Sequence, residues 1–153
     1  MEKFTTNAVS VASGTALAIL NLSNPAATPT SRGRIFYLTV GSVATPADQA
    51  ANFQIKRTTA AGTAAATFTP NNLDPAGPAG AYTSGQGAFS VEPTKTANKE
   101  LLIFPLNQRG TFQWYASPGC ELILPATQNN GACLETRTST STQTHTATMM
   151  FEE

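Results

Sequence analysis

Apolar and polar residues alternate along much of the chain with a period of two. The clearest case is the segment 143–151, which places apolar side chains on one face and threonines on the other: Ala147, Met149 and Phe151 against Thr144, Thr146 and Thr148. This period is that of a β-strand, in which successive side chains point to opposite faces. The pattern therefore predicts a strand with one buried face at this end of the chain.

Similar short segments recur between groups of Gly, Pro and Asn residues. They predict strands at 7–12, 16–22, 34–41, 51–58, 63–69, 88–92, 100–106, 111–117, 120–124, 133–138 and 143–151. Both faces of 34–41 are mostly apolar, which predicts a central strand covered on both sides. Many short strands at close spacing are typical of a β-sandwich or a β-barrel, and we expect an all-β, antiparallel β-sandwich. The long connections 42–49 and 70–87 favour a jelly-roll-like arrangement over a simple meander.

Nothing in the pattern divides the chain into two folded domains. We expect residues 31–153 to form a single β-sandwich domain. Residues 1–30 are apolar and uncharged beyond the first three positions, and their strand pattern is short. We therefore expect them to form an extended N-terminal arm or hairpin.

The composition narrows the choice of partners. Threonine and alanine supply 24 residues each, and nine basic residues balance nine acidic ones, so that only 12% of the chain is charged. A neutral, charge-poor surface gives no reason to expect nucleic acid or a membrane as partner. The apolar run 8–22 lacks a positive flank and is interrupted by polar residues, which is untypical of a signal peptide or a membrane span.

Residues for catalysis are few. His145 is the single histidine, so a nucleophilic triad would have to include it, and it lies in a threonine-rich strand without a carboxylate at a motif spacing. The carboxylates are scattered, and no phosphate-binding or metal-binding motif occurs. Cys120 and Cys133 are interpreted as reduced, buried apolar residues, although a bridge between them would indicate an extracellular protein. We expect no enzyme, no metal and no cofactor.

Contact surfaces remain as the candidates for function. A loop as long as 70–87 is uncommon in a compact domain unless it has a role, and the apolar segment 1–30 could pair with a neighbouring chain by strand addition. The candidate subunit or capsid contacts come from these two segments: Phe4, Val9, Val11, Leu17, Ile19, Leu20, Leu73, Asp74 and Tyr82.

Several phrases of the sequence resemble small proteins of tailed bacteriophages, above all head decoration (cement) proteins. They cover parts of 34–153, namely 53–63, Leu73-Asp74-Pro75, 105–109, 121–126, Asn129-Asn130-Gly131 and 150–153. The resemblance implies a β-sandwich subunit made in the host bacterial cytoplasm and located on the capsid surface of the virion. Its implied partners are the major capsid protein and its own copies, as a homotrimer. It implies no catalytic residue.

A second hypothesis is a tail-associated or lectin-like module that binds a receptor or glycan. It predicts an exposed aromatic side chain among Tyr37, Trp114 and Tyr115, because aromatic rings can stack on sugars. An enzyme of unfamiliar design is the third alternative. Gene neighbourhood and the copy number in virions distinguish the first two hypotheses.

Overall fold

The computed structural model describes residues 1–12, 17–43, 45–138 and 143–153, without the side chains of 10–12 and 138. Its described residues form strands and no helix. The strands are β1 (Lys3–Ala12), β2 (Ala18–Ser23), β3 (Gly33–Ser42), β4 (Ala50–Ala60), β5 (Thr63–Phe68), β6 (Asn71–Asn72), β7 (Thr83–Val91), β8 (Thr94–Asn107), β9 (Thr111–Tyr115), β10 (Leu122–Leu124), β11 (Gly131–Thr138) and β12 (Gln143–Glu152).

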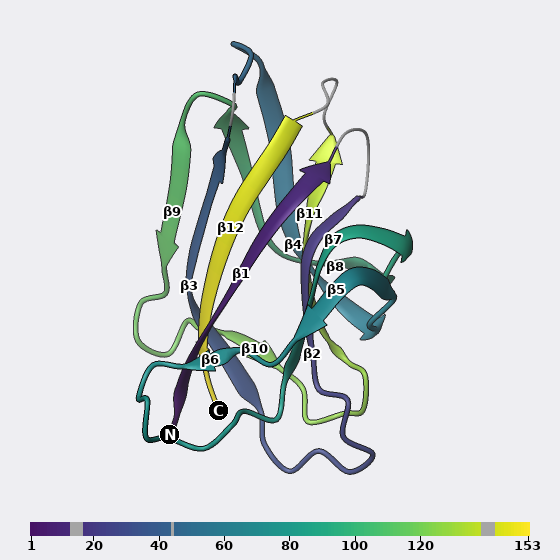
Figure 1. The fold of residues 1–153 in the computed structure, drawn as a ribbon, viewed down its shortest axis with the longest axis vertical. Helices are drawn as coiled ribbons and strands as arrows, with labels where there is room; N and C mark the ends of the chain where they lie inside the picture. Colours follow the sequence, from purple (N-terminus) through teal and green to yellow (C-terminus); the bar gives the residue numbers. More distant parts are fainter. Residues whose placement is uncertain (13–16, 44, 139–142) are drawn as a thin grey trace.

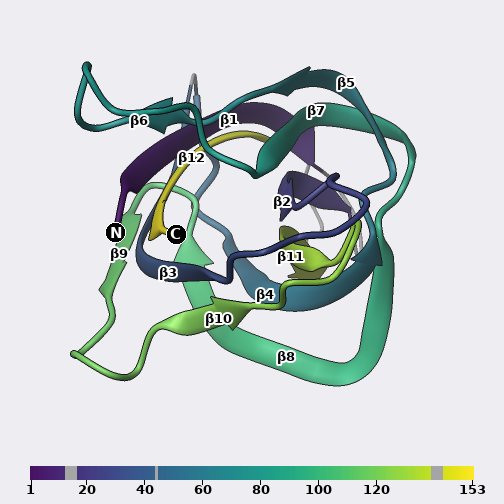
Figure 2. The ribbon, with the colours of Figure 1, turned by 90° about the horizontal axis from the view of Figure 1, so that it is seen from below.

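These strands form two antiparallel sheets that pack face to face (Figures 1 and 2). Sheet A has the order β10-β3-β12-β1-β6, with β9 pairing to β3 beside β10. Sheet B has the order β5-β7-β2-β11-β4-β8. The predicted all-β, antiparallel β-sandwich is confirmed.

The chain changes sheet at each step from β1 to β4, at both steps from β5 to β7, from β8 to β9, and at both steps from β10 to β12. Eight strands thus form two facing quartets, β1-β12-β3-β9 and β2-β11-β4-β8. The jelly-roll description stays a prediction, and this strand order is the observation that supports it.

The core lies between the inner faces of the two sheets. In β12 the predicted apolar face is confirmed, because Ala147, Met149 and Phe151 are at most 2% exposed. Opposite them, sheet B contributes large side chains such as Phe53 and Leu20, both fully buried. Phe112 and Trp114 of β9 pack against this core from its edge, as their shared face predicted.

The segment 1–30 is not a separate arm or hairpin, and this prediction is corrected. β1 lies between β12 and β6 in sheet A, and β2 lies between β7 and β11 in sheet B. β1 pairs with β12 over its whole length, from Lys3 opposite Glu152 to Ala12 opposite Gln143. A truncation of residues 1–22 would remove an interior strand from each sheet. We therefore expect such a truncation to prevent the domain from folding.

The prediction that β3 is covered on both sides is also wrong. The register with β12 shifts beside Phe36, so Tyr37 pairs with Met150 while Ile35 pairs with Phe151. This irregularity brings Ile35 onto the inner face with Leu38, and both are fully buried. The opposite face of β3 stays partly open to solvent because no further layer covers it.

The loop 70–87 is shorter than the sequence suggests. Residues 71–72 form β6, and β7 begins at Thr83. Hydrogen bonds join this segment to both ends of the chain. The Asn72 amide nitrogen of β6 donates to a Glu2 carboxylate oxygen at 3.1 Å, and the backbone N–H of Ala81 donates to the Glu153 carboxylate at 2.7 Å.

Candidate functional site

Four predicted contact residues lie in the core. Phe4, Ile19, Leu20 and Tyr82 are at most 1% exposed, and Phe4 stacks on Phe151 with ring centroids 5.4 Å apart. A side chain packed inside its own domain cannot meet a partner in this conformation. The prediction that these four residues contact a partner is therefore wrong. They are core residues, and packing within the domain explains their apolar character.

The other predicted contact residues lie in different places. Leu73, 48% exposed, and the exposed Asp74 line a shallow hollow together with the first three residues of the chain. Val9 is 59% exposed on the outer face of β1. Leu17 is half-buried beside Thr136. Val11 belongs to β1, but its side chain lies outside the described residues.

The outer face of sheet A brings together residues that the sequence pattern did not group. Cross-strand pairs along β1, β12, β3 and β9 form three rows of four residues: Thr5-Met150-Tyr37-Tyr115, Asn7-Thr148-Thr39-Gln113 and Val9-Thr146-Gly41-Thr111. We call these twelve residues the threonine face. None of them carries a charge, and all are half-buried or exposed.

Side-chain contacts join neighbouring strands across this face. The Thr148 hydroxyl donates to the Asn7 side-chain oxygen at 2.8 Å across the β12–β1 pair. At the β3–β9 edge the rings of Tyr37 and Tyr115 lie 4.7 Å apart at 48°. Tyr115 is 68% exposed, so the exposed aromatic that the glycan hypothesis predicts is present. Trp114 points the other way, toward the core.

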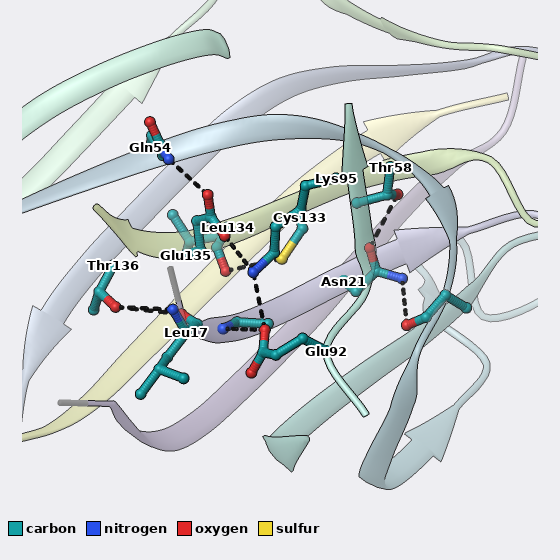
Figure 3. Close-up of polar contacts among 12 residues, drawn as sticks. Leu17, Asn21, Gln54, Thr58, Glu92, Lys95, Cys133, Leu134, Glu135 and Thr136 are labelled. Atoms are coloured by element: carbon teal, nitrogen blue, oxygen red, sulfur yellow. Dashed lines mark hydrogen bonds and ion pairs between the residues drawn. The ribbon is translucent and has the colours of Figure 1, made fainter. Parts of the chain in front are cut away.

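Sheet B has a different outer face, which is closed by a buried ionic cluster (Figure 3). The Lys95 ammonium lies 2.5 Å from Glu135 Oε2 and 2.9 Å from Glu92 Oε2. The Gln54 amide donates to Glu135 Oε1 at 2.6 Å, and the backbone N–H of Ala18 donates to Glu92 Oε2 at 3.0 Å. These contacts tie the beginning of β8 to β11, β4 and β2. We call Gln54, Glu92, Lys95 and Glu135 the Lys95 cluster.

Neighbouring strands extend this polar layer. Asn21 pairs with Cys133 in the β2–β11 register, and its side chain accepts from the Thr58 hydroxyl at 3.3 Å and donates to the Ala61 carbonyl at 3.2 Å. Alternation with the buried Phe53 and Ile55 would leave Gln54 on the solvent side of β4, but Gln54 is only 5% exposed because its side chain is bound to Glu135 within the cluster.

The electrostatics of the layer disfavour nucleophilic chemistry at neutral pH. Burial alone would lower the pKa of Lys95, but its hydrogen bonds to Glu135 and Glu92 outweigh this effect and raise the pKa. Burial raises the pKa of the Cys133 thiol well above its ordinary value, although the Lys95 charge opposes this. Lys95 therefore remains an ammonium and Cys133 a thiol, and neither is activated for attack.

His145 is buried between the sheets and belongs to the core of the sandwich. Its ring meets Phe53 edge-on, with centroids 5.0 Å apart, and Nδ1 lies 3.2 Å from the Ser42 hydroxyl. Burial lowers its pKa, partly opposed by a hydrogen bond at the Gly41 backbone. The sequence predicted an ordinary polar strand residue. The structure instead places a neutral imidazole in the core, away from the Lys95 cluster.

The two cysteines are both free, but they differ in exposure. Cys133 is buried, as predicted, whereas Cys120 is exposed in the turn before β10. Within the described ranges, no group of three or more His, Cys, Asp or Glu side chains is placed to hold a metal ion. The same part of the chain contains no helix that could span a membrane.

The fold and these surfaces define a two-sheet antiparallel β-sandwich in which the threonine face forms an uncharged patch on the outer side of sheet A. No protein-family model matches the chain, and no curated protein is significantly similar to it.

Proposed function

We propose that the chain is a non-catalytic structural protein of a virion, a capsid decoration protein that contacts its partner through the threonine face. The carrying observation is that twelve residues on four paired strands present no charge to the outside. Covering such a face removes no ion from water, so the desolvation cost that opposes burial of charged groups is absent. A rigid sheet also loses little conformational freedom when it binds.

The size of the face favours binding by several copies at once. Strands lie about 4.8 Å apart and alternate residues lie about 6.7 Å apart, so the three rows cover roughly 400 Å² with their side chains. This is about half of the area that each partner contributes to a standard protein interface. One copy would therefore bind weakly, whereas a homotrimer on repeated capsid sites would gain avidity.

The resemblance to head decoration proteins supports the identity of the partners. On this proposal the chain binds the major capsid protein and its own copies on the surface of the virion. Mass spectrometry of purified virions tests the location, because hundreds of copies per particle are expected. A few dozen copies or fewer would indicate a tail component.

A substitution in the centre of the threonine face tests the binding surface. Thr39→Lys places an ammonium in the middle row, and we expect at least a tenfold loss of binding to heads that lack the chain, measured by co-sedimentation. Thr94→Lys makes the same change at an exposed position of β8 and should bind as the unchanged protein does. Equal binding by both variants would refute the use of this face.

A glycan-binding module is the second candidate, and the Tyr37–Tyr115 pair is the observation that favours it. An exposed ring beside threonine and glutamine side chains offers stacking and hydrogen bonds to a sugar. This candidate predicts saturable binding to cell-surface glycans that Tyr115→Ala abolishes. Because Tyr115 is 68% exposed, the substitution should leave the fold intact. Unchanged glycan binding by Tyr115→Ala would refute the candidate.

A further inference from the structure

The free edge of β5 is a second surface of unusual character. β5 is the terminal strand of sheet B and pairs on one side with β7. It lies on the outside of the sandwich (Figure 2), and Thr63, Ala65, Ala66 and Thr67 are exposed. A terminal strand leaves a row of backbone N–H and C=O groups without partners in its own sheet, which is a template for another strand.

The other terminal strands are protected by their sequence or length. β8 carries Lys95, Lys99, Glu100 and Pro105, and charges and proline discourage pairing at an edge. β6 has two residues and β10 has three. β9 is short, with five residues. β5 contains neither a charge nor a proline, and no charged residue occurs anywhere from 58 to 73.

The sequence of β5 is suited to pairing with itself. Residues 63–67 read Thr-Ala-Ala-Ala-Thr, which is the same in both directions. In an antiparallel pair about a two-fold axis at Ala65, each Thr63 lies opposite a Thr67 and each Ala64 opposite an Ala66. Opposed threonines are favourable cross-strand neighbours, small alanines give no steric conflict, and no like charges meet.

We infer that β5 is a self-association edge that pairs antiparallel with β5 of a second copy, centred on Ala65. The pairing extends sheet B of one copy into sheet B of the other. The register against β7 shifts on both sides of Ala64, and at each shift the extra residue belongs to β7, so β5 itself contributes no extra residue to the pair. This inference concerns a surface other than the threonine face and does not depend on the proposed function.

The contact is small, and this sets its expected strength. A six-residue strand is roughly 20 Å long, so two such strands bury much less than a standard interface. We therefore expect a weak dimer that forms at high protein concentration or where copies are held close together. A covalent trap detects such a pair at equilibrium.

Disulfide trapping tests both the contact and its register. In a Cys120→Ser background, which removes the exposed thiol, Ala65→Cys should form a covalent dimer in glutathione buffer, because the paired Cα atoms would lie within disulfide range. Ala97→Cys is the matched control, since it is an exposed alanine of the other terminal strand of sheet B. We expect at least tenfold more dimer from Ala65→Cys at equal concentration.

A mixed experiment tests the two-fold axis. Ala64→Cys and Ala66→Cys proteins should cross-link to each other more than either does to itself, because these positions lie opposite one another only in the inferred register. Dimer yields from Ala65→Cys that equal those from Ala97→Cys would overturn the inference. Equal self-cross-linking at all three β5 positions would indicate random collision and would overturn it as well.

Discussion

Replacing Lys95 by methionine tests whether the Lys95 cluster stabilises the fold. The Glu135 side chain is 1% exposed and the Lys95 side chain 13% exposed, so this pair is shielded from water. Lys95→Met removes the cation and leaves the Glu135 carboxylate buried without it. Breaking a buried ion pair in this way costs about 3–5 kcal/mol, and we expect a loss of that size in the free energy of unfolding.

The Glu92–Lys95 ion pair should contribute much less to the free energy of unfolding. The Glu92 side chain is 34% exposed, so water screens its pairing with Lys95. We expect Glu92→Gln to cost about 1 kcal/mol or less. The Lys95 pKa is raised, so its stabilising contribution is complete below the unfolded value of 10.5 and is lost as the pH rises through the higher folded value. Measurements at pH 7 therefore sample the intact cluster.

Urea unfolding followed by circular dichroism measures these differences. Lys99→Met makes the same substitution at an exposed position of β8 and should lie within about 0.5 kcal/mol of the unchanged protein. Adding Glu135→Gln to Lys95→Met removes the stranded charge and should recover part of the loss, which gives a coupling free energy of about 1–3 kcal/mol. A Lys95→Met protein as stable as Lys99→Met would refute the reasoning.

Three further outcomes follow from single positions. Burial lowers the His145 pKa, so the neutral imidazole makes its full contribution to the free energy of unfolding above pH 6.5. Below pH 6.5 the free energy of unfolding should fall by up to about 1.4 kcal/mol per pH unit. His145→Gln should reduce this slope in unfolding titrations between pH 5 and 6.5. A Cβ at Gly131 would overlap the backbone carbonyl oxygen of Leu22 in β2, so Gly131→Ala should cost more than about 3 kcal/mol in urea unfolding. Gly119→Ala should cost about 1–2 kcal/mol, because Gly119 has a positive φ but open space around it. Under native conditions a thiol reagent should label Cys120 rapidly, whereas Cys133 should react only after unfolding, and fast labelling of both would contradict the buried position of the second thiol.

Local alternation predicted the class of fold because burial in a sandwich repeats every two residues. In β12 the rule identified Ala147, Met149 and Phe151 as core residues, and they are. In β3 the rule failed where the register shifts beside Phe36, since one extra residue moves the following side chains to the opposite face. A local pattern contains no signal for such a shift.

Long-range pairing explains the other differences. β1 pairs with β12 at the far end of the chain, and nothing within residues 1–30 indicates that partner, so the segment resembled a free arm. The Lys95 cluster requires β8, β11 and β4 to be adjacent. Alternation alone does not give the order of strands, and the carboxylates Glu92 and Glu135 therefore appeared scattered.

The two outer faces of the sandwich differ, and this difference supports the proposed contact through the threonine face. On sheet B, polar residues as far apart in the chain as Asn21 and Glu135 are at most 1% exposed, because the Lys95 cluster and its neighbours close that face from within the chain. On sheet A, the threonine face has no such cover, and yet it carries no charge that would favour water over a partner. The proposed function accounts for this difference, because a partner would cover the uncharged threonine face without removing an ion from water. The unprotected edge of β5 adds a second direction of contact, so that one copy could bind a surface and a neighbouring copy at the same time.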